Sequence, residues 1–132
     1  MKVVADTNLL LRFVLDDDPA QFKLAVEIME GSEAIVVTNV ALCELVWVLR
    51  RCYGVSRKNI AATIAGLRET RNIVFDSAAV EAGLAAIEAG ADFADGVIAY
   101  EGRWLGGDTF VSFDNKAVAA VAEQGLKATL LG

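Results

Sequence analysis

The chain has 132 residues, of which 55% are hydrophobic, and a net charge of −6 with no histidine. This length is enough for one domain whose core needs no disulfide or structural metal. Without histidine, the chain lacks the usual general base, the partner of a serine or cysteine triad and the most common zinc ligand. Its longest run without a charge, Ala34–Cys43, has ten residues, whereas a membrane-spanning helix needs about 20. We therefore expect a single domain, residues 1–132, that does not enter a membrane.

The first elements are predicted by apolar periodicity and by capping residues. Strands are predicted over residues 2–5 and 34–37, and helices over 9–15 and 19–31. Favoured N-cap residues precede both helices: Asp6, Thr7 or Asn8 before the first and Asp18 before the second. The apolar stretch before Asp6 is too short for a signal peptide, so we expect a cytoplasmic protein.

The rest of the chain continues the same alternation. Helices are predicted over residues 40–53, 57–70, 78–89, 93–105 and 116–123, and strands over 73–75, 109–113 and 128–131. Their caps are Ser56, Asp76 or Ser77, and Asp92. Short apolar strands that alternate with helices are typical of a parallel sheet covered on both faces, so we predict an α/β fold.

Two aspartates directly follow predicted strands. Asp6 comes after the first strand, and Asp114 after the strand over residues 109–113. In an open parallel sheet, ligands bind outside the carboxyl ends of the strands, so acids from different segments can converge there. Aspartate is also a favoured helix cap, which explains either residue equally well on its own.

Glu44 is the only charged residue in the run Val40–Leu49. Its helical neighbours Val40, Trp47 and Val48 are apolar, which predicts a carboxylate on an apolar helix face. A buried carboxylate without a partner costs several kcal/mol. We therefore expect Glu44 to face a metal ion or a hydrogen-bond network, or else a basic side chain elsewhere in the fold.

Asp92 and Asp95 are three residues apart at a helix start, which places them on one face where like charges repel. Asp92 suits a helix cap, whereas Asp95 lies one turn further along. Carboxylates within about 4 Å of one another repel by roughly 4 kcal/mol per pair at an effective dielectric near 20, so a cluster needs a cation to stay ionised. Carboxylate oxygens select Mg²⁺ or Mn²⁺, and such an ion can activate water in place of histidine.

Half of the twelve basic residues lie within residues 50–71, which contain a single acid, Glu69. They are Arg50, Arg51, Arg57, Lys58, Arg68 and Arg71. The segment therefore carries +5 and the remainder of the chain −11. A basic stretch beside an acidic body suits a phosphate-binding edge, and solvated faces of two helices explain it equally well.

Four motifs follow one another along the chain. They are Asp6-Thr7-Asn8 after the first strand, an isolated helical Glu44, Asp95 within Asp92–Ala99, and Phe113-Asp114 after a late strand. Together they resemble a PIN domain, and their order and the chain length are similar to VapC-type toxins of bacterial toxin-antitoxin pairs. The resemblance covers essentially the whole chain. It implies a three-layer α/β fold with a central parallel sheet flanked by helices.

The resemblance also implies a Mg²⁺- or Mn²⁺-dependent endoribonuclease that acts on transfer or ribosomal RNA. It implies a homodimer and a cognate VapB-like antitoxin that reaches into the acidic cleft, and the mean hydropathy of +0.46 indicates apolar surface that needs such cover. By position, the family's acidic quartet is matched by Asp6, Glu44, Asp95 and Asp114, with Asp6 and Asp95 as direct metal ligands. Asn8 and Ser112 match polar positions that orient the acids, and Asp92 is either a fifth acid or only a cap.

Three other interpretations fit parts of the sequence. A response-regulator receiver is also an acidic α/β domain and would use Asp76 as phosphoacceptor, but the chain lacks paired acids after the first strand. A phosphohydrolase of the haloacid dehalogenase type needs a second aspartate where this chain has Asn8. A catalytically silent PIN domain that only binds RNA is the third.

Overall fold

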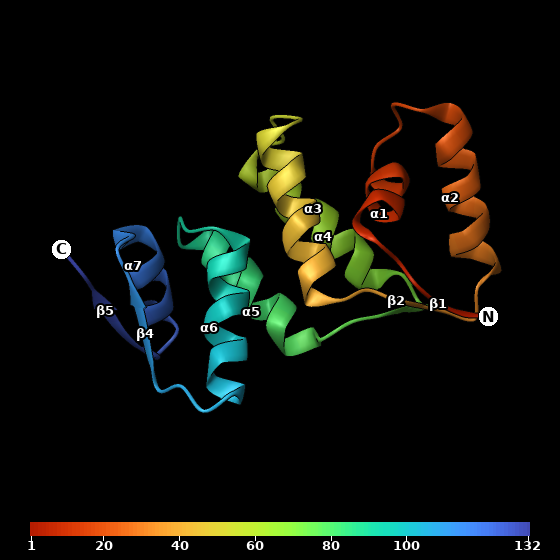
Figure 1. Ribbon diagram of the computed structural model, residues 1–132. Helices are drawn as coiled ribbons and strands as arrows, with labels where there is room; N and C mark the ends of the chain where they lie inside the picture. Colours follow the sequence, from red (N-terminus) through yellow and green to blue (C-terminus); the bar gives the residue numbers. More distant parts are fainter. The chain divides into compact units, whose positions relative to one another are not determined.

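The computed structural model describes residues 1–132, and the chain divides into two compact units, Met1–Phe75 and Asp76–Gly132. It contains seven helices and five strands, with one or two helices between successive strands. Figure 1 shows the course of the chain through them. Every predicted helix and strand is present, which confirms the α/β class with parallel strands. None of these helices has the combined length and hydropathy that crossing a membrane requires.

The first unit contains a three-stranded parallel sheet and four helices. Its elements are β1 (Lys2–Val4), α1 (Thr7–Val14), α2 (Pro19–Gly31), β2 (Ala34–Val36), α3 (Asn39–Arg51), α4 (Arg57–Glu69) and β3 (Ile73–Val74). The strands pair in the order β1–β2–β3, and the register aligns Val3, Ile35 and Ile73. Ile35 and Ile73 are buried, whereas Val4 and Val74 on the opposite face are exposed. Within this unit, Ile35 and Ile73 therefore mark the face of the sheet that packs against the core.

The second unit contains a pair of parallel strands and three helices. Its elements are α5 (Ser77–Glu88), α6 (Phe93–Trp104), β4 (Thr109–Ser112), α7 (Asn115–Glu123) and β5 (Lys127–Leu130). β4 pairs with β5, with Ser112 opposite Leu130. The hydrogen-bonded strands of the protein are described as two parallel sheets, one in each unit. Alternating strands and helices predict that strands run parallel, but not which strands pair.

Capping side chains fix the starts of the helices, as predicted. Asp18 accepts a hydrogen bond from the Gln21 N–H at 3.1 Å, and Ser56 accepts one from the Asn59 N–H at 3.2 Å. Of the three candidate caps before α1, the structure selects Asp6. These side chains satisfy N–H groups that have no partner inside the helix, so short polar signals in the sequence set the helix boundaries.

The helices α5 and α6 approach closely because glycines lie at their contact. A Cβ atom on Gly96 would collide with the backbone carbonyl of Ala82, and one on Gly83 would collide with the ring of Phe93. Phe93 is among the most deeply buried side chains of the protein. Glycine alone leaves room for this backbone approach. The contact fixes the first turn of α6, which carries Asp95.

Candidate metal-binding active site

Asp6 stands at the junction between β1 and α1. The preceding residue, Ala5, is buried, and its N–H donates to the Val36 carbonyl at 3.0 Å, which fixes the end of the strand. The Asp6 Oδ1 atom accepts a hydrogen bond from the Leu9 N–H at 2.8 Å and so caps the helix. The side chain is exposed, and the structure gives its second oxygen no hydrogen bond. One carboxylate oxygen is therefore available to a ligand.

Glu44 lies on α3, beside the start of α1. The Thr7 hydroxyl donates a long hydrogen bond of 3.4 Å to the Glu44 Oε2 atom. Thr7 follows Asp6 directly, so this contact brings Glu44 next to the first strand-to-helix junction. The sequence interpretation treated Thr7 only as a candidate cap. Its contact with Glu44 was missed, and the one signal in the sequence was a hydroxyl group next to Asp6.

The expected burial of Glu44 is wrong. Its side chain is exposed, and its apolar neighbours Val40 and Trp47 are themselves 68% and 59% exposed. The core face of α3 is formed instead by Ala41, Leu42, Leu45, Val46 and Leu49. The helix is apolar on more than one side, so a charge within its apolar run does not have to point into the core.

Asp95 lies in the first turn of α6 and is half-buried. Its Oδ2 atom accepts a hydrogen bond of 3.2 Å from the backbone N–H of Asp92, the N-cap residue. Burial raises the pKa of the Asp95 carboxyl; the Asp92 N–H lowers that pKa, and the negative charges of Asp92 and Asp114 raise it. The net shift is upward. Three acids of the second unit therefore share one electrostatic environment.

The raised pKa predicts that Asp95→Asn stabilises the metal-free protein at neutral pH. Because the pKa in the folded state exceeds that in the unfolded state, the charged carboxylate costs stability above the folded pKa. That cost disappears as the pH falls through the folded pKa toward about 4, where the unfolded carboxyl is protonated as well. Thermal unfolding in chelator should give the variant the higher Tm at neutral pH and equal values in acid. A less stable variant at neutral pH would mean that the carboxylate supports the fold.

Asp114 caps α7 directly after β4. Its Oδ1 atom accepts hydrogen bonds from the N–H groups of Lys116 at 2.9 Å and Ala117 at 3.3 Å. The Asp114 N–H donates to the Ser112 Oγ atom at 3.0 Å, so Ser112 holds this junction in the orienting position predicted for it. Asn8, the other predicted orienting residue, is exposed and has no hydrogen bond to any of the acids. The second oxygen of Asp114 also has no hydrogen bond.

Each unit thus holds two members of the predicted quartet. The first unit brings Glu44 into contact with Thr7, the residue after Asp6, and the second brings Asp95 near Asp114, with Asp92 as a third acid. Neither unit by itself gathers three acids closely enough to bind a metal ion. The donors are nevertheless all carboxylate oxygens, the chemistry that suits a hard divalent cation.

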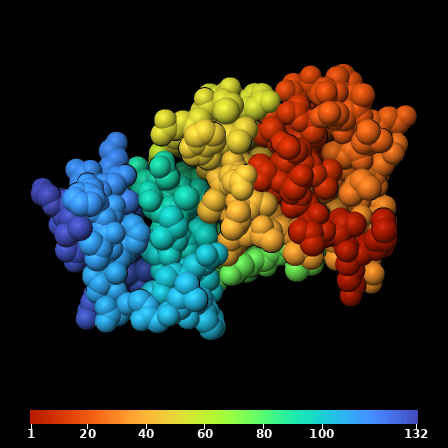
Figure 2. Space-filling model, in the orientation of Figure 1, coloured from red at the N-terminus to blue at the C-terminus, as the bar shows by residue number.

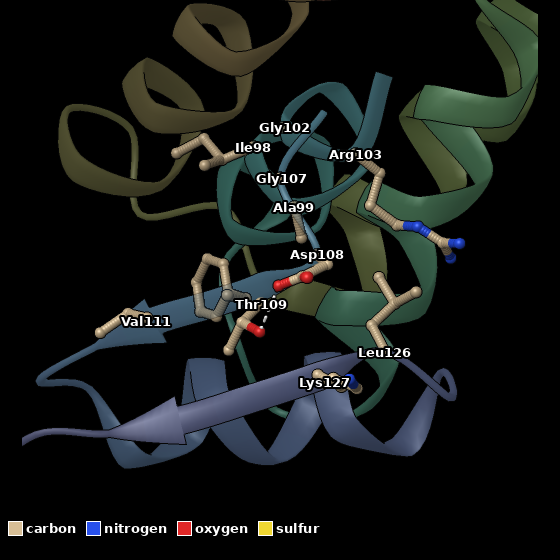
Figure 3. Close-up of a pocket in the computed structure, with 11 residues that line it drawn as sticks. Ile98, Ala99, Gly102, Arg103, Gly107, Asp108, Thr109, Val111, Leu126 and Lys127 are labelled. Carbon is tan, nitrogen blue, oxygen red and sulfur yellow. Dashed lines mark hydrogen bonds between the residues drawn. The ribbon is translucent and has the colours of Figure 1, made fainter. Parts of the chain in front are cut away.

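A hollow of about 230 Å³ lies between α6, β4 and β5 in the second unit, as Figure 3 shows. Apolar side chains and glycine backbone form much of its wall, and Asp108 beside it accepts a hydrogen bond of 2.7 Å from the Thr109 hydroxyl. No member of the quartet lines it. The hollow is therefore separate from the four acids predicted to form the site.

The basic segment predicted to contact RNA covers the end of α3, the turn after it and α4. In Figure 2, the stretch around residues 50–60, in yellow, forms part of the visible surface of the first unit. Arg51, Lys58 and Arg71 are exposed, and the other three basic residues are half-buried. These exposed side chains are accessible to phosphate groups. That they bind RNA remains a prediction.

Comparison with known proteins identifies the family. The model of the PIN domain matches residues 3–123, a range that runs through both units. No curated protein matches the chain. PIN domains are generally nucleases and typically use divalent metal ions, in agreement with the carboxylate donor set. Because the match covers nearly the whole sequence, the chain belongs to the PIN domain family.

Proposed function

We propose that the protein is a Mg²⁺- or Mn²⁺-dependent endoribonuclease. Its metal ion would be bound jointly by four carboxylates: Asp6, Glu44, Asp95 and Asp114. One observation carries the proposal. Asp6 and Asp114 both stand at strand-to-helix junctions, and each binds backbone N–H groups through one oxygen and leaves the other without a hydrogen bond. A family match that runs through both units supports assigning the two pairs to one centre.

The residues are suited to hold a hard cation. The helix caps fix the directions of the Asp6 and Asp114 carboxylates, and the Asp92 N–H fixes that of Asp95. Besides burial, repulsion from the negative charges of Asp92 and Asp114 raises the pKa of Asp95, and a bound cation would reduce this repulsion. A bound divalent ion supplies a Lewis acid for the charge that develops on a phosphodiester during hydrolysis. The chain needs this help because it has no histidine.

RNA is the proposed substrate, with transfer or ribosomal RNA as the target class. The contact surface is the basic segment: Arg50, Arg51, Arg57, Lys58, Arg68 and Arg71. In a protein with a net charge of −6, this segment is the one concentrated source of positive charge for a polyanion. A homodimer, also part of the proposal, would present the segment twice.

The proposal includes the role of a VapC-like toxin neutralised by a cognate VapB-like antitoxin. It rests on the order of the four acidic motifs. The neighbouring gene tests this role. A small upstream reading frame with a DNA-binding N-terminus and an apolar C-terminal tail favours a toxin, and its absence favours a processing nuclease.

Thermal unfolding tests the metal centre directly. An ion that binds only the folded protein stabilises it by about 2.7 kcal/mol at a hundred times its Kd. Millimolar Mn²⁺ should therefore raise the Tm by on the order of 5 to 10 °C. Glu44→Gln and Asp114→Asn should each reduce this shift.

Asp76→Asn is the matched control for the thermal shift, since Asp76 caps α5 through the Ala79 N–H at 3.1 Å and lies outside the quartet. The control should keep the full shift. Equal shifts in all three variants, or none in the wild type, would contradict the shared metal centre.

A further inference from the structure

Phe113 directly precedes Asp114 and is 80% exposed. Hydrogen bonds hold the backbone on both sides of it. The Leu131 N–H donates to the Ser112 carbonyl at 2.9 Å, and the Asp114 N–H donates to the Ser112 Oγ atom at 3.0 Å. The aromatic ring therefore projects into solvent from a fixed junction.

The ring contributes little to the packing of its own unit. At 80% exposure it has lost only a minor part of its contact with water, so the fold gains little hydrophobic stabilisation from it. The chain end lies beside it, since a Cβ atom on Gly132 would lie 3.8 Å from the ring. Leu131, which precedes Gly132, is itself 41% exposed. An exposed aromatic side chain beside an acid of the quartet can accept a ligand with a flat apolar face.

We propose that Phe113 is a stacking platform for an unpaired nucleobase next to the scissile phosphate, an inference that rests on the proposed ribonuclease function. Consecutive Cα atoms lie about 3.8 Å apart, so a phosphodiester held at Asp114 has its flanking nucleotides within reach of the Phe113 ring. Aromatic side chains bind bases of any sequence by stacking, provided that the base is unpaired. The substrate at this position is therefore single-stranded RNA, such as a loop.

The charge around Phe113 fits the same ligand. Lys116 is exposed in the first turn of α7, two residues after Asp114, and places a positive charge where the next phosphate of the strand would pass. Phe113 and Lys116 together offer a base contact and a phosphate contact on either side of an acid of the quartet. Phe113 is a positioning residue, since it orients the nucleotide rather than reacting with it.

Trp104 provides a matched control because it is another exposed aromatic residue of the second unit, 78% exposed. It lies nine residues beyond Asp95, at the opposite end of α6. Its indole N–H donates to the Tyr100 hydroxyl at 2.7 Å, so its edge is bonded within its own helix. Removing Trp104 deletes exposed aromatic surface at the end of α6 opposite to Asp95.

The experiment is a double-mutant cycle that combines changes in the protein with removal of a base from the RNA. A single-stranded RNA is cleaved with Mn²⁺ by the wild type and by Phe113→Ala, Phe113→Leu, Phe113→Trp and Trp104→Ala. Each protein also receives the same RNA with an abasic nucleotide on either side of the cleaved bond. Phe113→Ala should lower kcat/KM on intact RNA by on the order of tenfold, mainly through KM, with an unchanged Tm. Phe113→Trp should restore the value, Phe113→Leu should not, and Trp104→Ala should match the wild type.

Removal of the stacked base should cost the wild type the same factor and cost Phe113→Ala nothing further, because the two changes delete one contact. Equal sensitivity of both proteins to the missing base at both positions would overturn the proposal. So would a wild type that cleaves RNA no better than Phe113→Ala, while leaving the ribonuclease function intact. A wild type that never cleaves RNA with either metal would overturn the ribonuclease function itself, and the stacking role with it.

Discussion

Asp6→Asn and Asp95→Asn should each lower RNA cleavage by on the order of a thousandfold while the protein stays folded. Asparagine keeps the size of the side chain but removes the charge that a divalent cation requires. The cap formed by the Asp6 Oδ1 atom with the Leu9 N–H survives, because asparagine is as good an N-cap as aspartate. Asp95→Asn should even raise the Tm at neutral pH, since the pKa of Asp95 is raised in the folded state.

In Asp95→Asn, cleavage should fall while the Tm rises. This combination identifies a functional carboxylate, because substitution of a residue kept for folding would lower stability and activity together. Gel-based cleavage of RNA with Mn²⁺, together with circular dichroism, measures both quantities. Asp18→Asn is the control, since Asp18 caps α2 through the Gln21 N–H at 3.1 Å and is outside the quartet. Near-normal cleavage by Asp6→Asn would mean that Asp6 serves only as a cap. Comparable losses in all three variants would mean that the losses do not arise at a metal site.

Gly96→Ala should destabilise the second unit by about 3 kcal/mol or more and abolish cleavage, although it removes no chemical group. The added Cβ atom would collide with the Ala82 carbonyl, which is backbone and cannot rotate away. The helices α5 and α6 would have to separate, and the first turn of α6 carries Asp95. Urea unfolding and limited proteolysis measure the loss.

Gly102→Ala is the control within the same helix, because a Cβ atom at Gly102 would meet nothing within 4 Å. That substitution should be neutral or stabilise the helix by up to about 1 kcal/mol, since alanine is the better helix former. If Gly96→Ala proved as stable and active as Gly102→Ala, the two helices would not be in backbone contact, and the rigid placement of Asp95 would need another cause.

Local features of the fold were readable from the sequence because their causes are local. Asp18 and Ser56 cap the helices they were predicted to cap, since an N-cap is a bond to an N–H three residues away. Strand pairing was not readable. The division into β1–β2–β3 and β4–β5 depends on contacts between distant residues, which the period of an apolar strand does not encode.

The candidate site was predictable to a similar extent. The positions of Asp6 and Asp114 after strands follow from sequence order, and the structure places both at helix starts. The exposure of Glu44 was mispredicted because apolar neighbours along a helix do not reveal which side faces the core. The raised pKa of Asp95 depends on its burial and on Asp114, nineteen positions away in the sequence, so only the fold reveals it.

Cleavage of single-stranded RNA by the purified protein, with and without a divalent ion, tests the central claim most directly. The control is Asp6→Asn, purified in the same way, which corrects for contaminating nucleases. We predict cleavage with Mg²⁺ or Mn²⁺, its loss in excess chelator, its return when the ion is restored, and none with the variant. Cleavage that persists in excess chelator and disappears in Asp6→Asn would contradict the metal-dependent mechanism.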